Sequence, residues 1–160
     1  MTGSILSSID TKSQIAKVTL YGVFDQQGVA AQIFSSLGQQ GFNVEAITTT
    51  QRGRKRADIS FAVPEQDIPR LTRLIHSMKV RFGARKVSID RNRALLILYG
   101  AKGFAAPGAA GQIFAKFSEL GINIEMISSS LSILALVIPR EKAGAITEVL
   151  KQEFVAGSGA

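Results

Sequence analysis

Two stretches of the chain place apolar residues at helical spacing, with polar residues on the opposite side. One follows the turn that ends at Gly28, and the other lies near Pro107–Leu120. Residues three and four positions apart line one face of a helix, so each stretch predicts an amphipathic helix. A glycine ends each of them, Gly41 and Gly121. The apolar positions are Val29, Ala30, Ile33, Phe34 and Leu37, and then Ala109, Ala110, Ile113, Phe114 and Phe117.

These two stretches are copies of one another. GVAAQIFSSLGQQGFNVEAI (28–47) returns as GAAGQIFAKFSELGINIEMI (108–127), with nine of twenty positions identical at an offset of eighty residues and no gap. Identity this dense at a fixed spacing is the signature of a duplicated module. The 160 residues therefore form two small modules and not one large domain.

The pattern around the first copy predicts one complete module. An amphipathic pattern over 68–81 predicts a second helix, and β-branched, alternating segments predict four strands. Two of the strands form a hairpin about Gly53. The order βαββαβ is that of a ferredoxin-like α+β fold, in which two helices cover one face of an antiparallel sheet. The expected strands are 17–24, 43–51, 56–63 and 84–90.

The second copy lacks its last strand. Its expected strands are 93–101, 122–130 and 132–138, its last helix follows Pro139 to about Phe154, and only a Gly/Ser-rich end remains. An unfilled sheet edge is a liability, and the segment 4–10 is a spare apolar strand. We expect that segment to fill the edge, so that the first module is inserted in the second. The expected domains are 15–91, then 92–155 with 4–10, followed by a disordered tail, 156–160.

Composition excludes several classes of protein. There is no cysteine, so disulfides, thiol nucleophiles and thiolate metal sites are absent. No apolar run is long enough to cross a membrane, and no basic-then-apolar leader predicts secretion. A cytoplasmic location is the default expectation.

The net charge of +7 raises the possibility of a nucleic-acid partner. Much of the excess lies in QRGRKR around Gly53, which we interpret as a solvated hairpin tip. Tyr21 and Tyr99 do not form the aromatic pattern of an RNA-binding sheet, and no aromatic residues interleave with the basic cluster. Nucleic-acid binding is therefore the less favoured interpretation.

No pattern predicts a catalytic or metal site. His76 lies on the polar side of its helix without companion ligands, and Gly100–Gly103 lacks the spacing of a phosphate loop. We expect no catalytic residues, no metal and no cofactor.

The most informative chemistry lies where the first strand turns into the first helix. Backbone N–H groups at the start of a helix suit a carboxylate. Asp25 lies beside them, and Asn43 and Glu45 follow the helix on a neighbouring strand. Together these groups could bind both the carboxylate and the ammonium group of an amino acid. The alternative is local: Asp25 only begins a turn, and Asn43 and Glu45 only begin a strand.

With these motifs in hand, the sequence resembles a tandem of ACT domains, and most closely the regulatory region of aspartate kinase (aspartokinase). The resemblance is carried by AKVTLYGVFDQQGVAAQIFSSLGQQGFNVEAI, RADISFAVP and GAAGQIFAKFSELGINIEMISSS, and it covers about residues 3–155. It implies allosteric feedback control by an amino acid, typically lysine or threonine. It further implies a homodimer in which the first module of one chain meets the second module of the other, with a kinase catalytic domain that responds.

The resemblance also implies which residues bind the effector. In the first module they are Asp25, Gln27, Gly28, Val29, Ala30, Asn43, Val44 and Glu45. In the second they are Pro107, Gly108, Ala109, Asn123, Ile124, Glu125 and Met126.

Several positions depart from the family pattern. Gln27 replaces the usual proline of the turn, Glu45 the usual aspartate, and Thr49 a frequent glutamine; Ser130–Ile133 replaces a charged segment. These departures preserve the fold and keep open a second interpretation, a structural dimerisation module whose ligand sites have decayed. The kinase catalytic domain, which needs several hundred residues in that family, is not in this chain, so the chain is not expected to be an enzyme.

Overall fold

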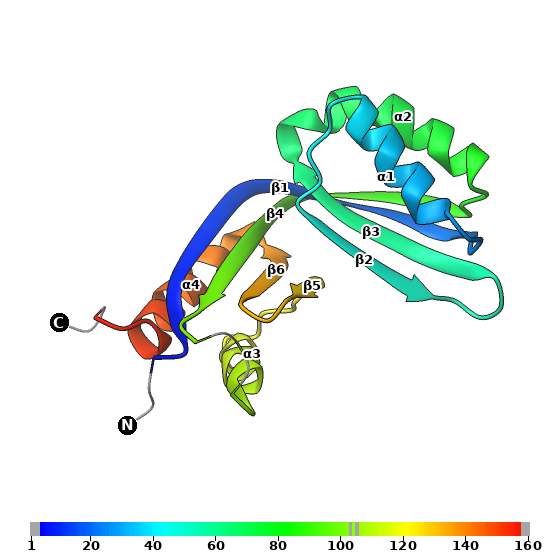
Figure 1. Ribbon diagram of the computed structural model, residues 1–160. Helices are drawn as coiled ribbons and strands as arrows, with labels where there is room; N and C mark the ends of the chain where they lie inside the picture. Colours follow the sequence, from blue (N-terminus) through cyan, green and yellow to red (C-terminus); the bar gives the residue numbers. More distant parts are fainter. Residues whose placement is uncertain (1–3, 103, 105, 158–160) are drawn as a thin grey trace. The chain divides into compact units, whose positions relative to one another are not determined.

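The computed structural model describes residues 4–102, 104 and 106–157 of the chain. These residues form two units, each a four-stranded antiparallel sheet with two helices on one face (Figure 1). One unit spans Gln14–Arg91, and the other takes the chain up to Ser13 and from Asn92 onward. Both units have the ferredoxin-like α+β architecture that the sequence pattern predicts. Residues 158–160 of the expected tail lie outside the described residues.

The elements follow the predicted order. They are β1 Leu6–Phe24, α1 Val29–Gln39, β2 Ala46–Gln51, β3 Arg56–Pro64, the short 3-10 helix η1 Glu65–Asp67, α2 Ile68–Arg81, β4 Lys86–Gly100, α3 Ala109–Glu119, β5 Met126–Ser129, β6 Ile133–Pro139 and α4 Arg140–Phe154.

Two predicted strand boundaries were wrong. The segments 4–10 and 17–24 are parts of one strand, β1, and the segments 84–90 and 93–101 are parts of one strand, β4. Neither connecting stretch contains glycine or proline, so nothing in it forces a turn. At Asn92 the backbone enters the left-handed region, with φ 60°, a conformation that asparagine tolerates better than most residues. The strand continues through it.

The strand order is the same in both units. In the unit Gln14–Arg91 the order is β2-β3-β1-β4, and in the other unit it is β5-β6-β4-β1. The N-terminal part of β1 thus takes the fourth position in the second sheet. Ala101 donates its backbone N–H to Ile5 at 2.9 Å, and Leu6 forms a parallel bridge with Val155. The residues before Gln14 and those from Asn92 onward thus form one compact unit.

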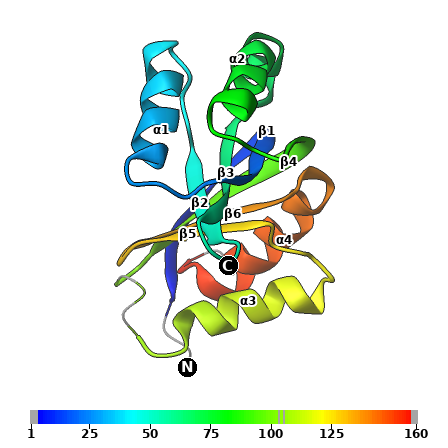
Figure 2. The ribbon, with the colours of Figure 1, turned by 90° about the vertical axis from the view of Figure 1, so that its right-hand side faces the viewer.

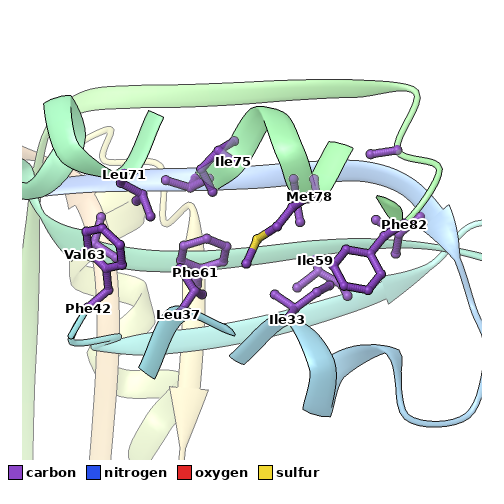
Figure 3. Packing of buried hydrophobic residues seen from close by; sticks show 14 of the residues in the cluster. Ile33, Leu37, Phe42, Ile59, Phe61, Val63, Leu71, Ile75, Met78 and Phe82 are labelled. Carbon is purple, nitrogen blue, oxygen red and sulfur yellow. The ribbon is translucent and has the colours of Figure 1, made fainter. Parts of the chain in front are cut away.

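The core of the unit Gln14–Arg91 lies between its sheet and its helices. Figure 3 shows side chains from β3, α1 and α2 pointing toward one another. Phe61 is fully buried, and its ring meets that of Phe34 edge to face at 5.9 Å between centroids. Each fully buried large apolar side chain stabilises the fold by about 1.5–3 kcal/mol. The labelled core residues from these three elements are Ile59, Phe61, Val63, Ile33, Leu37, Leu71, Ile75 and Met78.

The other unit repeats this arrangement with α3 and α4 on one face of its sheet (Figure 2). Its core joins Leu96 of β4, Leu136 of β6, Phe117 of α3 and Leu150 of α4. Leu6 is fully buried in the same cluster. The N-terminal segment therefore supplies a core side chain as well as a strand.

The strands that precede α1 and α3 are related by a different number of residues than the two helices are. Leu20 pairs with Ile59 in one sheet, and Leu98 pairs with Leu134 in the other. Leu20-Tyr21-Gly22 therefore corresponds to Leu98-Tyr99-Gly100, at 98 − 20 = 78 residues, whereas the helices are related by 108 − 28 = 80. The turn before α3 is thus two residues longer than the turn before α1.

Candidate functional site

The turn before α1 is anchored to two other segments of its unit. The register of β1 shifts between Leu20 and Val23. Beyond this shift, Phe24 donates its backbone N–H to the carbonyl of Phe82 at 3.0 Å. Asp25 donates its N–H to the carbonyl of Lys55, in the β2–β3 hairpin, at 2.9 Å. The predicted site residues 25–28 therefore have a fixed backbone.

Glycine starts the first helix of each unit. Gly28 and Gly108 have φ values of 86° and 82°, in the left-handed region that glycine tolerates at little cost. Neither α1 nor α3 has a side-chain cap or an acidic residue in its first turn. The first backbone N–H groups of both helices thus have no acceptor from a capping side chain or from an acidic residue of the first turn.

A pocket of about 190 Å³ adjoins the start of α1. Two of the predicted site residues line it, Gln27 and Val29, whereas Asp25 is not among its lining residues. Five further residues line the pocket that sequence analysis did not select: Phe24, Gln26, Gln32, Arg81 and Phe82. Arg81 lies at the end of α2, and no sequence pattern relates it to the turn.

Arg81 is the charged side chain of this pocket. It donates from Nη2 to Oε1 of Gln32 at 3.4 Å, and its guanidinium lies 5.2 Å from the centroid of the Phe82 ring. These contacts hold the guanidinium beside the pocket, since a cation over an aromatic face is attracted by the ring.

The ring of Phe24 lies close to Arg56 and Gly83. The guanidinium carbon of Arg56 lies 3.9 Å from the ring centroid. Gly83, with φ 68°, has no side chain, and a Cβ there would approach the ring to 2.2 Å. Phe24 nonetheless remains 44% exposed. The pocket therefore has an aromatic wall that is both fixed and accessible.

Asn43, Val44 and Glu45 lie between α1 and β2. Asn43 Nδ2 donates to Oε1 of Glu45 at 3.2 Å, and the backbone N–H of Glu45 donates to the carbonyl of Ala62 at 2.8 Å. Val44 is half-buried against the core. Ala30 is exposed in the first turn of α1. The structure thus brings the predicted amide and carboxylate into contact with each other.

The predicted residues of the second copy occupy the equivalent positions. Pro107 and Gly108 precede α3, and Ala109 is its first residue and is buried. Asn123 is exposed and Ile124 is half-buried, and Met126 is buried at the start of β5. Of these candidates, Asn123 and Ile124 are at least partly accessible, whereas Ala109 and Met126 are buried.

Glu125 makes a close ion pair. Its Oε2 lies 2.6 Å from Nε of Arg93, and the two side chains are 13% and 24% exposed. A charge that is mostly buried is tolerated when it is paired in this way. Any ligand that used the Glu125 carboxylate would share it with Arg93.

The basic hairpin is only partly a solvated tip. Arg54 and Lys55 are exposed, in agreement with that interpretation. Arg52, in contrast, pairs with buried Asp58 at 2.7 Å, and Asp58 accepts the backbone N–H of Gly22 at 2.9 Å. Arg56 donates to the carbonyls of Gly22 and Gly83 at 2.7 and 2.9 Å. Two of the four basic residues are therefore structural.

Neither a metal site nor a membrane-spanning helix is found among the described residues. Among the described residues, no three His, Asp or Glu side chains gather so that they could hold a metal ion. His76 is exposed on α2. No helix in the described ranges has the length and apolar character needed to span a bilayer.

Comparison with known proteins agrees with this geometry. A family model for the ACT domain matches residues 18–78 and again 96–154. The aspartokinase of Corynebacterium glutamicum is 25% identical over 158 residues, which cover 96% of this chain and 37% of that protein. Aspartokinase 2 of Bacillus subtilis is 26% identical over 150 residues, covering 94% and 36%. The chain thus spans little more than a third of these relatives.

Solved structures show the same relationship. The aspartokinase alpha and beta subunits match with a TM-score of 0.82 at 26% identity, covering 92% of this chain and 97% of that one. The ligand-free regulatory subunit of aspartate kinase from Thermus thermophilus matches with a TM-score of 0.84 at 24% identity, covering 94% and 99%.

The aspartokinase resemblance inferred from the repeat is thereby confirmed. The chain covers about a third of the length of these kinases and almost the whole of the structure described as a regulatory subunit. With two matches that together cover most of its length, the chain belongs to the ACT domain family, as a tandem of two such domains.

Proposed function

We propose that this chain is an allosteric regulatory module that binds a small amino acid, lysine or threonine, and acts on an aspartate kinase catalytic domain in the cytoplasm. The observation that carries the proposal is the match to aspartokinase over 96% of the chain, combined with a first helix whose start has no side-chain cap. Regulation follows by linkage: a ligand that binds one arrangement of the protein better than another shifts the population toward it.

The chemistry of the first module supports an amino-acid ligand. The donors at the start of α1 suit its carboxylate. The carboxylates of Asp25 and Glu45 suit its ammonium group, and the Asn43 amide can donate and accept. Because Asn43 contacts Glu45, these two groups would act together on one ligand.

The sheet edges support a homodimer. Strands β2 and β5 each lie at the end of the strand order in their unit. Ile47 on β2 is 44% exposed and Ile127 on β5 is 46% exposed, at equivalent positions of the repeat. An exposed edge with apolar side chains favours pairing with another chain. We propose that the first module of one chain pairs with the second module of the other, with the effector between them, where Asn123 and Glu125 would contribute.

Calorimetric titration with lysine and with threonine tests the proposal. Asp25→Ala is expected to weaken binding about tenfold, the effect of losing one charge-assisted hydrogen bond. Glu141→Ala, which removes an exposed carboxylate from the first turn of α4, is the matched control and leaves the affinity unchanged. Sedimentation with and without ligand reports the dimer. A stable dimer that binds neither amino acid would instead support the decayed, structural interpretation.

A further inference from the structure

The first helix of each unit carries an equivalent groove on its exposed face. The α1 groove is lined by Gln32, Ser35, Ser36 and Gln39 together with Arg81. The α3 groove is lined by the residues eighty positions later, Gln112, Ala115, Lys116 and Glu119, together with Glu153 of α4. Because these four helix residues of each groove correspond, the second unit is an internal reference for the first.

The two grooves differ in how their charges are compensated. In the α3 groove, Lys116 Nζ lies 2.9 Å from Glu153 and 3.1 Å from Glu119. The hydrogen bond to Glu153, and after it the hydrogen bond to Glu119, raises the pKa of Lys116 above its usual value. In the α1 groove Ser36 stands in place of the lysine, and the cation is Arg81. Among the described residues that line this groove, none is a carboxylate.

Arg81 also faces the neighbouring pocket at the start of α1. The pocket and the groove share Gln32 and Arg81, and among the described lining residues of the pocket there is again no carboxylate. The neutral amide of Gln32, at 3.4 Å, is the polar side chain that Arg81 contacts there. The guanidinium therefore has donors available for an anion from solution.

The other walls of the pocket suit a small organic molecule. Phe24 offers an exposed ring that Arg56 and Gly83 hold in one position. The amides of Gln26 and Gln27 can donate or accept hydrogen bonds. A volume of about 190 Å³ is below the roughly 300–1,000 Å³ of pockets for drug-sized ligands. The ligand that fits is a compact metabolite and not a nucleotide.

We propose that this pocket binds a small carboxylate, with its carboxyl group on Arg81 and its carbon skeleton against Phe24. Since no acidic side chain lines the pocket, the ligand needs no ammonium group. This distinguishes it from the amino-acid effector proposed above, on which the inference does not depend. In the second unit the described cation of the corresponding groove, Lys116, is already paired with Glu153 and Glu119.

Isothermal titration with succinate, with its neutral isostere succinamide as the matched ligand, tests the proposal. Succinate is expected to bind the intact chain and succinamide is not. Arg81→Gln, which keeps a side chain that can hydrogen-bond but removes the charge, is expected to weaken succinate binding at least about tenfold. Arg73→Gln is the control, because Arg73 is an exposed arginine on the same helix that lines neither pocket.

The outcomes separate this proposal from the effector proposal. If Arg81→Gln loses succinate but keeps lysine or threonine binding, both stand. If succinate and succinamide bind equally, or if Arg81→Gln and Arg73→Gln weaken succinate equally, the carboxylate site is overturned whatever the amino acids do. Inorganic phosphate at matched ionic strength binding as well as succinate would also overturn it, because the site would then lack carboxylate selectivity.

Discussion

The guanidinium of Arg56 stacks 3.9 Å from the centroid of the Phe24 ring while it donates to the carbonyls of Gly22 and Gly83. One side chain from β3 thus joins the end of β1 to the loop that follows α2. Because Phe24 immediately precedes the turn into α1, this arrangement fixes the position of the turn relative to the rest of its unit.

Replacing Arg56 tests this arrangement. Arg56→Ala is expected to lower the free energy of unfolding by about 2 kcal/mol, from two hydrogen bonds to carbonyls and one cation–π contact. Arg56→Lys recovers less than half of this, since an ammonium group cannot reproduce the planar guanidinium fork. Urea denaturation measures both. The control is Arg54→Ala at the exposed tip, which stays within about 0.5 kcal/mol of wild type. Equal losses at Arg54 and Arg56 would contradict the structural role.

Substitutions at two glycines distinguish the cost of backbone strain from the cost of a steric clash. Gly53 and Gly83 have nearly the same φ, 66° and 68°, but a Cβ at Gly53 meets nothing within 4 Å, whereas one at Gly83 meets the Phe24 ring at 2.2 Å. Gly53→Ala is expected to cost about 1 kcal/mol, and Gly83→Ala about 2–4 kcal/mol, because overpacking adds to the strain. Thermal unfolding gives both values. Phe24→Ala should reduce the additional cost at Gly83, and its failure to do so would argue against the clash.

Asp58 is the acidic partner of the same region. It is 9% exposed and accepts from the backbone N–H of Gly22 and from Arg52. Asp58→Ala leaves the buried Gly22 N–H without its acceptor, and we expect a loss of about 1–3 kcal/mol in urea denaturation. Asp67→Ala, which removes a half-buried carboxylate at the start of α2, serves as the comparison and should cost less than half as much.

We propose that residues 4–10 belong to the same domain as 92–155, and Leu6 provides the test. Leu6→Ala removes a fully buried side chain from the core of that unit, and the expected loss is about 2–5 kcal/mol. Hydrogen exchange should accelerate most at amides of β6 and α4. The control is Ser8→Ala, an exposed position of the same strand. A similar, small effect from both variants would place the segment outside the domain.

The repeat made most of the fold predictable. Identity at a single offset indicated two modules, and the helical spacing of residues such as Ile33 and Ile113 located the core faces, because burial imposes that period. The strand boundaries were less predictable, since nothing local shows that β1 and β4 continue through both units. A second signal is the recurrence of Leu-Tyr-Gly at 20–22 and 98–100, which shows that the turns differ in length.

The candidate site was less predictable than the fold. Gln27 and Val29 could be selected because they adjoin a helix start, which is a local feature. Arg81 and Phe24 line the same pocket only through tertiary structure, since 81 − 24 = 57 residues separate them. The difference in charge between the two copies, with Ser36 in the place of Lys116, acquires meaning only when the grooves that these residues line are known.

The parallel bridge between Leu6 and Val155 has a consequence for the order in which the protein folds during synthesis. The unit Gln14–Arg91 is continuous in sequence, so it can form as soon as it has emerged from the ribosome. The other unit joins two segments that lie on either side of this one in the sequence, so the bridge between Leu6 and Val155 can form only after both have been made. Contacts this distant in sequence form slowly, after a large loop-closure cost. The discontinuous unit is therefore expected to complete its folding after the continuous one.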